Sequence, residues 1–195
     1  GRSVEAGARG DFFADRLTVS ATSYRLRQDD ILTRDPANPA LSVQGGSLDV
    51  RGAELSVTLR PHERWWLNLN GAVNHAEYDE LSGSSGEDLS GNRLTNVPEH
   101  TANLSSAYTL AALPLTLGGA VRYSGDFYTS TANQYRVDER TLLDAWSSYP
   151  LAKGTLTLRG RNLTDAFYAD WSGYSATQVY VGEPRTVELS WTGRF

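Results

Sequence analysis

The stretch that decides the fold is "RTVELSWTGRF", residues 185–195, where the sequence ends. Val187, Leu189, Trp191 and Phe195 share one parity, and Thr, Glu, Ser and Arg residues occupy the other. Strict alternation with period two predicts a β-strand that has one apolar face and one polar face. A chain terminus is usually polar and poorly ordered. The pattern therefore predicts that residues 185–195 form a full-length strand and not a disordered terminus.

Composition narrows the class of protein. The 195 residues carry a formal net charge of −5, so we expect no nucleic acid as a partner. The sequence has no cysteine, which excludes disulfides and thiolate metal sites. Five Trp, ten Tyr and five Phe are too much aromatic surface for a disordered coil. No apolar run is long enough for a membrane-spanning helix, the first residues do not resemble a secretion signal, and no linker divides the chain. We expect one structural unit.

Period-two alternation recurs along the chain, and helical periodicity is almost absent. Nine segments carry the alternation: 2–9, 15–33, 43–60, 63–79, 99–110, 114–126, 139–150, 154–163 and 184–195. Most last ten residues or more, against a usual strand length of about five or six, and about ten residues are what a tilted strand needs to cross a bilayer. In the second segment the apolar parity changes between Ala21 and Tyr24, which predicts a β-bulge there.

The connections between these segments alternate in length. Tight turns are expected near 9–15 and at 60–63, 111–114 and 150–154, whereas the links 34–42, 80–98, 127–138 and 164–183 are long and rich in Gly, Ser, Asn and Asp. Aromatic residues gather near both expected strand ends. They are Trp65, Tyr108, Tyr149, Trp191 and Phe195 at the short-turn end, and Tyr78, Tyr123, Phe127, Tyr128 and Phe167 at the other.

These patterns favour an all-β fold, an antiparallel up-and-down transmembrane β-barrel segment of about nine strands. Two aromatic girdles around an aliphatic waist are typical of a membrane barrel, with the apolar face toward the lipid bilayer and the polar face toward a hydrated lumen. An odd number of alternating strands does not close an antiparallel cylinder, so the barrel would be incomplete. A soluble β-sandwich or barrel is the alternative, because alternation alone does not distinguish them.

Several stretches resemble a known family. "DILTRDPANPALSVQGGSLDVRGAELSVTLRP" (30–61), "GNRLTNVPEHTANLSSAYTL" (91–110), "LRGRNLTDAFY" (158–168) and "VGEPRTVELSWTGRF" (181–195) resemble successive strands at the C-terminal end of TonB-dependent outer-membrane receptors, nearest to the ferric-siderophore branch. No single motif decides the matter, and "NLTD" alone is weak. Four stretches in the same order, spanning nearly the whole chain, make the resemblance specific.

The resemblance implies a transporter in the cell outer membrane, with twenty-two strands and an N-terminal plug inside. Such a receptor captures a ferric siderophore outside the cell and imports it with energy relayed by TonB, which contacts the plug region. The family's last residue is an aromatic read by the outer-membrane assembly machinery, and Phe195 matches it. No plug and no TonB-contacting box are found in residues 1–195, so we expect the C-terminal part of a receptor barrel.

Ligand contacts are expected in the long loops, because connections longer than a hairpin needs are often functional. Aromatic side chains suit a bulky organic chelate. The candidates are Phe127, Tyr128, Tyr135, Tyr168, Trp171, Tyr174 and Tyr180. Phe127, Tyr128 and Tyr168 are also explained as girdle anchors. Lumen-facing polar residues such as Arg122, Asp144, Arg159 and Arg161 are explained either as a hydrated wall or as contacts to a plug or ligand.

The sequence gives little support for catalysis. His62, His75 and His100 have no neighbours at metal-ligand spacing, and no G-x-S-x-G motif occurs. We therefore expect no catalytic residue, no resident metal and no cofactor. Two functional alternatives stay open: the same architecture with another cargo, such as cobalamin, a different metal chelate or a glycan, and a soluble all-β binding or carbohydrate-active protein.

Overall fold

The computed structural model describes residues 1–151, 153–173 and 175–193. Its main sheet contains nine strands. They are β1 (Arg2–Phe12), β2 (Leu17–Arg34), β3 (Ser42–His62), β4 (Trp65–Glu80), β5 (His100–Thr109), β6 (Thr116–Ser124), β9 (Arg140–Leu151), β10 (Gly154–Arg161) and β13 (Thr186–Gly193). Each pairs antiparallel with the next in the order β1-β2-β3-β4-β5-β6-β9-β10-β13. All nine predicted segments are confirmed as strands of one up-and-down sheet.

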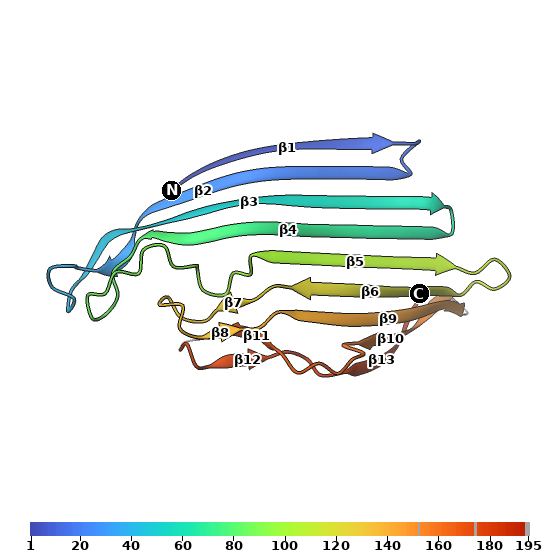
Figure 1. The fold of residues 1–195 in the computed structure, drawn as a ribbon. Coiled ribbons are helices and arrows are strands. Elements are labelled where there is room, and N and C mark those ends of the chain that lie inside the picture. The colour runs from blue at the N-terminus through green and yellow to red at the C-terminus, as the bar shows by residue number, and fades with distance from the viewer. Residues whose placement is uncertain (152, 174, 194–195) are drawn as a thin grey trace.

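The long and short connections lie at opposite ends of this sheet (Figure 1). Turns of a few residues join β1 to β2, β3 to β4, β5 to β6 and β9 to β10. Longer connections follow β2, β4, β6 and β10, and the last two contain small hairpins of their own, β7 (Phe127–Tyr128) with β8 (Arg136–Val137) and β11 (Ala169–Ser172) with β12 (Val179–Val181). The predicted alternation of connection lengths is confirmed.

The apolar face of the sheet is uncovered. Val19, Val57, Leu69, Leu104, Val121 and Leu143 lie opposite one another in register across six strands. Leu117 and Leu189 on the same face are 47% and 67% exposed, because the described chain forms one curved layer with no second layer over this face (Figure 1). Soluble monomers rarely expose a contiguous apolar surface of this size to water. This face is therefore expected to contact an apolar environment. The opposite face carries Asn, Ser and Thr residues.

The predicted bulge between Ala21 and Tyr24 is wrong. β2 and β3 pair without interruption from Leu17 opposite Leu59 to Gln28 opposite Leu48. The parity changes because Tyr24 lies on the polar face, where its ring covers Gly52 of β3 and its hydroxyl donates to Asn74 of β4. The register shifts between Gln28 and Ile31 instead.

The structure agrees with the predicted aromatic girdle at the short-turn end but differs from the one predicted at the loop end. At the short-turn end, Trp65 lies opposite Tyr108, and Tyr149 and Trp191 flank Leu156, all on the apolar face as predicted. At the loop end, only Tyr123 lies on the apolar face of a strand. Tyr78 lies on the polar face opposite Leu48, and Phe127 is buried in the loops. The prediction of a second girdle is therefore wrong for these two residues, because proximity to a strand end does not fix which face a side chain occupies.

A search of the described residues for a helix long and apolar enough to cross a membrane finds none.

Candidate functional site

The long loops at one end of the sheet form a connected layer. Thr95 of the β4–β5 loop forms a β-bridge with Tyr128 of the β6–β9 loop. The Thr129 hydroxyl donates to the Ala176 carbonyl of the β10–β13 loop at 2.6 Å. Backbone and side-chain hydrogen bonds thus join segments that are far apart in sequence, and they give the loops defined positions relative to one another.

Three asparagines organise this layer. Asn96, Asn133 and Asn162 have φ angles of 61°, 52° and 46°, in the left-handed region that asparagine tolerates better than most residues. The Asn96 amide accepts from Ser172 N and donates to Ser172 O, with distances of 2.8 and 3.3 Å. Asn133 accepts from Arg93 N and donates to Arg93 O. Each amide thereby bonds the backbone of a segment outside its own turn.

Asn162 is the most deeply placed of the three, with 2% of its surface exposed. Its Nδ2 donates to the carbonyls of Ala166 and Glu183 at 2.9 and 3.0 Å, and its Oδ1 accepts from Ala166 N at 2.9 Å. Its own backbone N donates to Asp144 Oδ1 at 3.0 Å. The side chain of Asn162 therefore joins the two ends of the β10–β13 loop, and its backbone N attaches them to β9.

Charged groups reinforce the layer. Arg93 pairs with Asp126 at 3.0 Å, and Arg136 pairs with the same carboxylate at 3.3 Å. The Arg93 guanidinium lies 5.2 Å from the centre of the Tyr128 ring, a cation–π distance. In the β4–β5 loop, hydrogen bonds from Ser90 hold the pKa of the Asp88 carboxyl below its usual value.

A polar cavity of about 520 Å³ lies where β6, β9 and β10 meet the β10–β13 loop. It is lined by Arg122, Asp144, Arg159, Arg161, Asn162, Tyr168, Asp170, Val181, Gly182 and Glu183. Arg122 pairs with Asp144 at 3.1 Å, and Arg161 is 3.6 Å from Glu188 and 3.7 Å from Glu183. Within the described residues Arg159 has no ion-pair partner. Its guanidinium is thus available to an anionic group that enters the cavity.

Aromatic side chains lie at this cavity and on the β10–β13 loop, where Tyr168 lines the cavity and Trp171 and Tyr180 belong to the β11–β12 hairpin. Arg140 pairs with Asp170 at 2.9 Å and lies 5.2 Å from the centre of the Tyr168 ring. Trp171 and Tyr180 stack face to face across the β11–β12 hairpin, with ring centres 4.4 Å apart and planes 7° apart. Both rings are about half exposed, so they offer a flat apolar surface at the loop end.

The structure separates the predicted ligand residues into three groups. Tyr168, Trp171 and Tyr180 come together on the β10–β13 loop, and Tyr168 lines the cavity. Tyr128 and Tyr135 lie in the β6–β9 loop, Tyr128 under Arg93 and Tyr135 half exposed. Phe127 is only 2% exposed and packs within the loop layer. Tyr174 and Phe195 lie outside the described residues.

The residues that position the site had not been selected from the sequence. Asn162 belongs to the "NLTD" stretch and Asn96 to the "GNRLTNVPEH" stretch, but neither was proposed as a loop anchor. Asn next to turn residues is the signal that could have indicated them. No local sequence pattern indicated a role for Arg140, because its partners Asp170 and Tyr168 lie about thirty residues away in the chain.

The side chains at this end have the chemistry needed to bind a ligand. Among the residues the structure describes, no group of three His, Cys, Asp or Glu side chains is arranged to hold a metal ion. His75 contacts Glu77 at 3.1 Å and Glu99 at 3.8 Å, on the outward face of the sheet and away from the cavity. Arginines, aromatic rings and hydrogen-bonding groups around an open cavity suit an anionic organic ligand.

Comparison with known proteins gives concordant results. Residues 1–163 match the family model described as TonB dependent receptor-like, beta-barrel. The metal-pseudopaline receptor CntO of Pseudomonas aeruginosa is 31% identical over 198 residues, and the ferrichrome outer membrane transporter/phage receptor of Escherichia coli is 29% identical over 203 residues. These matches cover 98% and 100% of the chain, but 27% and 26% of the relatives. The chain thus spans about a quarter of their length.

Solved structures agree with this result. The siderophore receptor PiuA of Acinetobacter baumannii superposes with a TM-score of 0.84 at 26% identity, covering 97% of this chain and 28% of that one. The ferric preacinetobactin receptor BauA of the same species gives a TM-score of 0.79 at 25% identity, with the same coverage. The uncovered apolar face of the nine-stranded sheet is accordingly a lipid-facing surface. The chain belongs to the TonB-dependent receptor-like β-barrel family of the outer membrane.

Proposed function

We propose that residues 1–195 form the C-terminal part of the barrel of an outer-membrane receptor that imports a ferric siderophore with energy relayed by TonB. The observation that carries the proposal is the combination of a lipid-facing sheet with a loop layer at one end. A cavity of about 520 Å³ there is lined by arginines and Tyr168, and Trp171 and Tyr180 stack on the same loop. Relatives that are named as siderophore receptors match nearly the whole chain.

The edges of the sheet support the assignment to part of a larger barrel. β1 and β13 have a hydrogen-bonded neighbour on only one side within the described chain. A bare strand edge is very unfavourable in hydrocarbon, because unpaired backbone groups find no water there. We infer that both edges pair with further strands of the same receptor, and that a plug region inside the closed barrel receives TonB.

We further propose that the chelate is held at the loop end of the lumen. Tyr168, Trp171 and Tyr180 provide flat apolar contacts, Tyr128 and Tyr135 extend that surface, and Arg159 binds a carboxylate or phenolate oxygen. Tyr174, outside the described residues, is kept as a proposed ligand contact. Phe127, buried under these loops, supports them rather than the ligand directly. Phe195 is proposed as the signal for the outer-membrane assembly machinery. The chain acts in transport, and we infer no catalytic step.

A second cargo class is favoured by one finding. The relative that is 31% identical is named a metal-pseudopaline receptor, so its cargo is a metal chelate that is not described as ferric. The alternative proposal is therefore import of another metal chelate by the same architecture. Cobalamin and glycan cargoes have no comparable support among the relatives described above.

The test is uptake by cells that express the full-length receptor as their only TonB-dependent transporter. Cells are supplied with ⁵⁵Fe or ⁶³Ni on single chelators from the hydroxamate, catecholate and carboxylate classes. Import of ⁵⁵Fe on one class, abolished when TonB is removed, is the expected result. Import of nickel without iron favours the alternative cargo. No TonB-dependent uptake of any chelate contradicts both proposals.

The binding residues are tested in the same cells. Arg159→Gln is expected to weaken the binding of an anionic chelate about fivefold while leaving a neutral one unchanged, because it removes one charge-assisted hydrogen bond. Arg64→Gln, a loss of the same charge in the β3–β4 turn, is the matched control. Equal effects of both variants would contradict the assignment of the cavity.

A further inference from the structure

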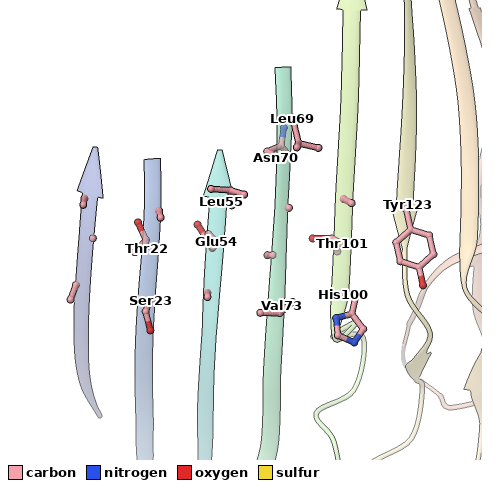
Figure 2. A pocket seen from close by; sticks show the side chains of 18 residues that line it. Thr22, Ser23, Glu54, Leu55, Leu69, Asn70, Val73, His100, Thr101 and Tyr123 are labelled. Atoms are coloured by element: carbon pink, nitrogen blue, oxygen red, sulfur yellow. The ribbon is translucent and has the colours of Figure 1, made fainter. Parts of the chain in front are cut away.

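The outward, lipid-facing side of the sheet carries a groove that the proposed transport function does not use. A hollow of about 880 Å³ crosses β1 to β6 on this face. Its middle row contains the small residues Ala8, Ala21, Gly71 and Ala102, with Leu55 between Ala21 and Gly71 and Tyr123 at the β6 end. Leu69 and Val73 form part of its wall. Figure 2 shows Ser23 on β2, Val73 on β4, His100 on β5 and Tyr123 on β6 around this hollow.

A second cavity of about 440 Å³ adjoins the groove on the side of the long loops. The two share Ser23, Ala53, Val73 and His100. The second cavity is lined in addition by Arg51, His75 and Glu99. Arg51 precedes Ala53 by two residues on the same face of β3, a distance of about 7 Å along a strand. The combined depression is therefore apolar toward the middle of the sheet and charged at its outer end, where Arg51, His75 and Glu99 lie.

The arginines at the outer end are arranged unfavourably for the protein alone. Arg25 lies directly opposite Arg51, and Arg2 lies directly opposite Arg27. Like charges directly opposite one another on neighbouring strands are destabilising. Asp49 at 2.8 Å neutralises Arg25, and Asp29 and Asp79 neutralise Arg27.

No such partner serves Arg51, which has neither an ion pair nor a side-chain hydrogen bond within the described residues. The nearby Glu77 contacts His75, and Glu99 contacts both His75 and Arg93. A single anionic group that sits against Arg51 would relieve its repulsion from Arg25 and occupy the charged end of the depression.

We propose that this depression binds one phosphate-bearing lipid of the surrounding membrane, with an acyl chain in the groove and the phosphate at Arg51. Charge complementarity selects the occupant, because a neutral lipid leaves Arg51 unpaired and a soluble anion leaves the apolar groove empty. The arrangement also follows the order of a membrane leaflet, with the apolar rows toward the centre and the arginine row toward the headgroups. The site faces away from the lumen, so it is independent of the chelate pocket.

Native mass spectrometry of the full-length receptor in detergent tests the proposal, with phosphatidylglycerol and a diacylglycerol of identical chains as the probes. Wild-type receptor is expected to retain phosphatidylglycerol at least fivefold more tightly than diacylglycerol. Arg51→Gln is expected to remove that preference, since one arginine near a lipid headgroup accounts for about a fivefold change. Arg51→Lys, which keeps the charge, should retain most of it. Arg16→Gln in the β1–β2 turn is the matched control and should change nothing.

A second variant tests the groove itself. Ala21→Leu fills the hollow on a face that already accepts large apolar residues, so the barrel should assemble normally while both lipids bind about tenfold more weakly. Equal retention of the two lipids by the wild-type receptor would overturn the role of Arg51. Retention unchanged in both Arg51→Gln and Ala21→Leu would overturn the site. Displacement of phosphatidylglycerol by millimolar inorganic phosphate would show a free anion site and overturn the lipid assignment.

Discussion

The two ends of the nine-stranded sheet are stabilised by different means. At the short-turn end a few residues reverse the chain, and Trp65, Tyr108, Tyr149 and Trp191 turn their rings outward. At the loop end the connections are long, and side-chain amides and arginines bond one loop to another. Hydrophobic pattern alone places the first end in the membrane interface. The second end needs specific polar contacts, so the surface of its loops can vary without a change in the strands.

The largest expected effect concerns the contrast between the two faces of the strands. Leu104, 43% exposed, lies between Leu69 and Val121 in the middle of the apolar face. Leu104→Arg should destabilise the full-length receptor in lipid vesicles by about 2–4 kcal/mol, because a charge at the bilayer midplane loses its hydration. Urea unfolding measures the change.

Its matched control is Ser105→Arg, the next residue along β5, which points to the polar face. That variant should change the free energy of unfolding by no more than about 0.5 kcal/mol, as for an ordinary hydrated position. A larger loss for Ser105→Arg than for Leu104→Arg would reverse the assignment of lipid and lumen faces.

The next effect tests the loop end. Asn162→Ala removes the three side-chain hydrogen bonds that bind Ala166 and Glu183, and it leaves buried backbone groups unpaired at a left-handed φ. We expect a loss of about 2–3 kcal/mol, confined to the β10–β13 loop. Hydrogen exchange of amides 164–183 should therefore accelerate by one to two orders of magnitude, with β10 and β13 protected as before.

Asn103→Ala is the comparison variant for this prediction. Asn103 makes a single exposed side-chain hydrogen bond, to Asn70 at 3.0 Å, on the strand wall. Its loss should leave the loop amides unchanged. Faster exchange throughout the barrel in Asn162→Ala would mean that the loop layer and the strand wall unfold together, and the distinction between the two regions would fail.

A third effect separates the two faces of one strand. The indole of Trp146 lies over Gly118 on the polar face, and a Cβ added at Gly118 would fall within the ring. Gly118→Ala must displace that ring, which stacks on Trp66 with centres 6.3 Å apart, so we expect a loss of about 1–2 kcal/mol. Trp fluorescence should shift as well.

Gly119→Ala on the opposite face provides the contrast. An added Cβ there meets only the Asp144 carbonyl oxygen at 3.4 Å, and an alanine restricts the unfolded chain more than a glycine does. This variant should be neutral or slightly stabilising. Equal losses at the two glycines would show that backbone flexibility, rather than the ring above Gly118, is what the strand requires.

The strands could be predicted from the sequence because alternation is a local property. The alternation in segment 184–195 predicts β13, and the predicted turns place the ends of the other strands within a few residues of their observed positions. The placement of Tyr24 could not be predicted, since it depends on Gly52 and Asn74 in two other strands. The same holds for the loop end. The contact between Asn96 and Ser172 spans 76 residues, and no pattern near either residue indicates the other.

The smallest effect returns to the short-turn end, where the backbone rather than the side chains is unusual. Phe13, Ala14 and Asp15 have φ angles of 55°, 52° and 63°, so three consecutive non-glycine residues are left-handed. A left-handed residue that carries a Cβ costs about 1–2 kcal/mol. Ala14→Gly removes that cost but increases the entropy of the unfolded chain, so we expect a net gain of about 0.5–1 kcal/mol in urea unfolding. Ala112→Gly, in the β5–β6 turn where φ is not positive, should instead lose a similar amount. A loss in both variants would show that the β1–β2 turn gains nothing from glycine, and that contacts beyond the backbone hold it in this conformation.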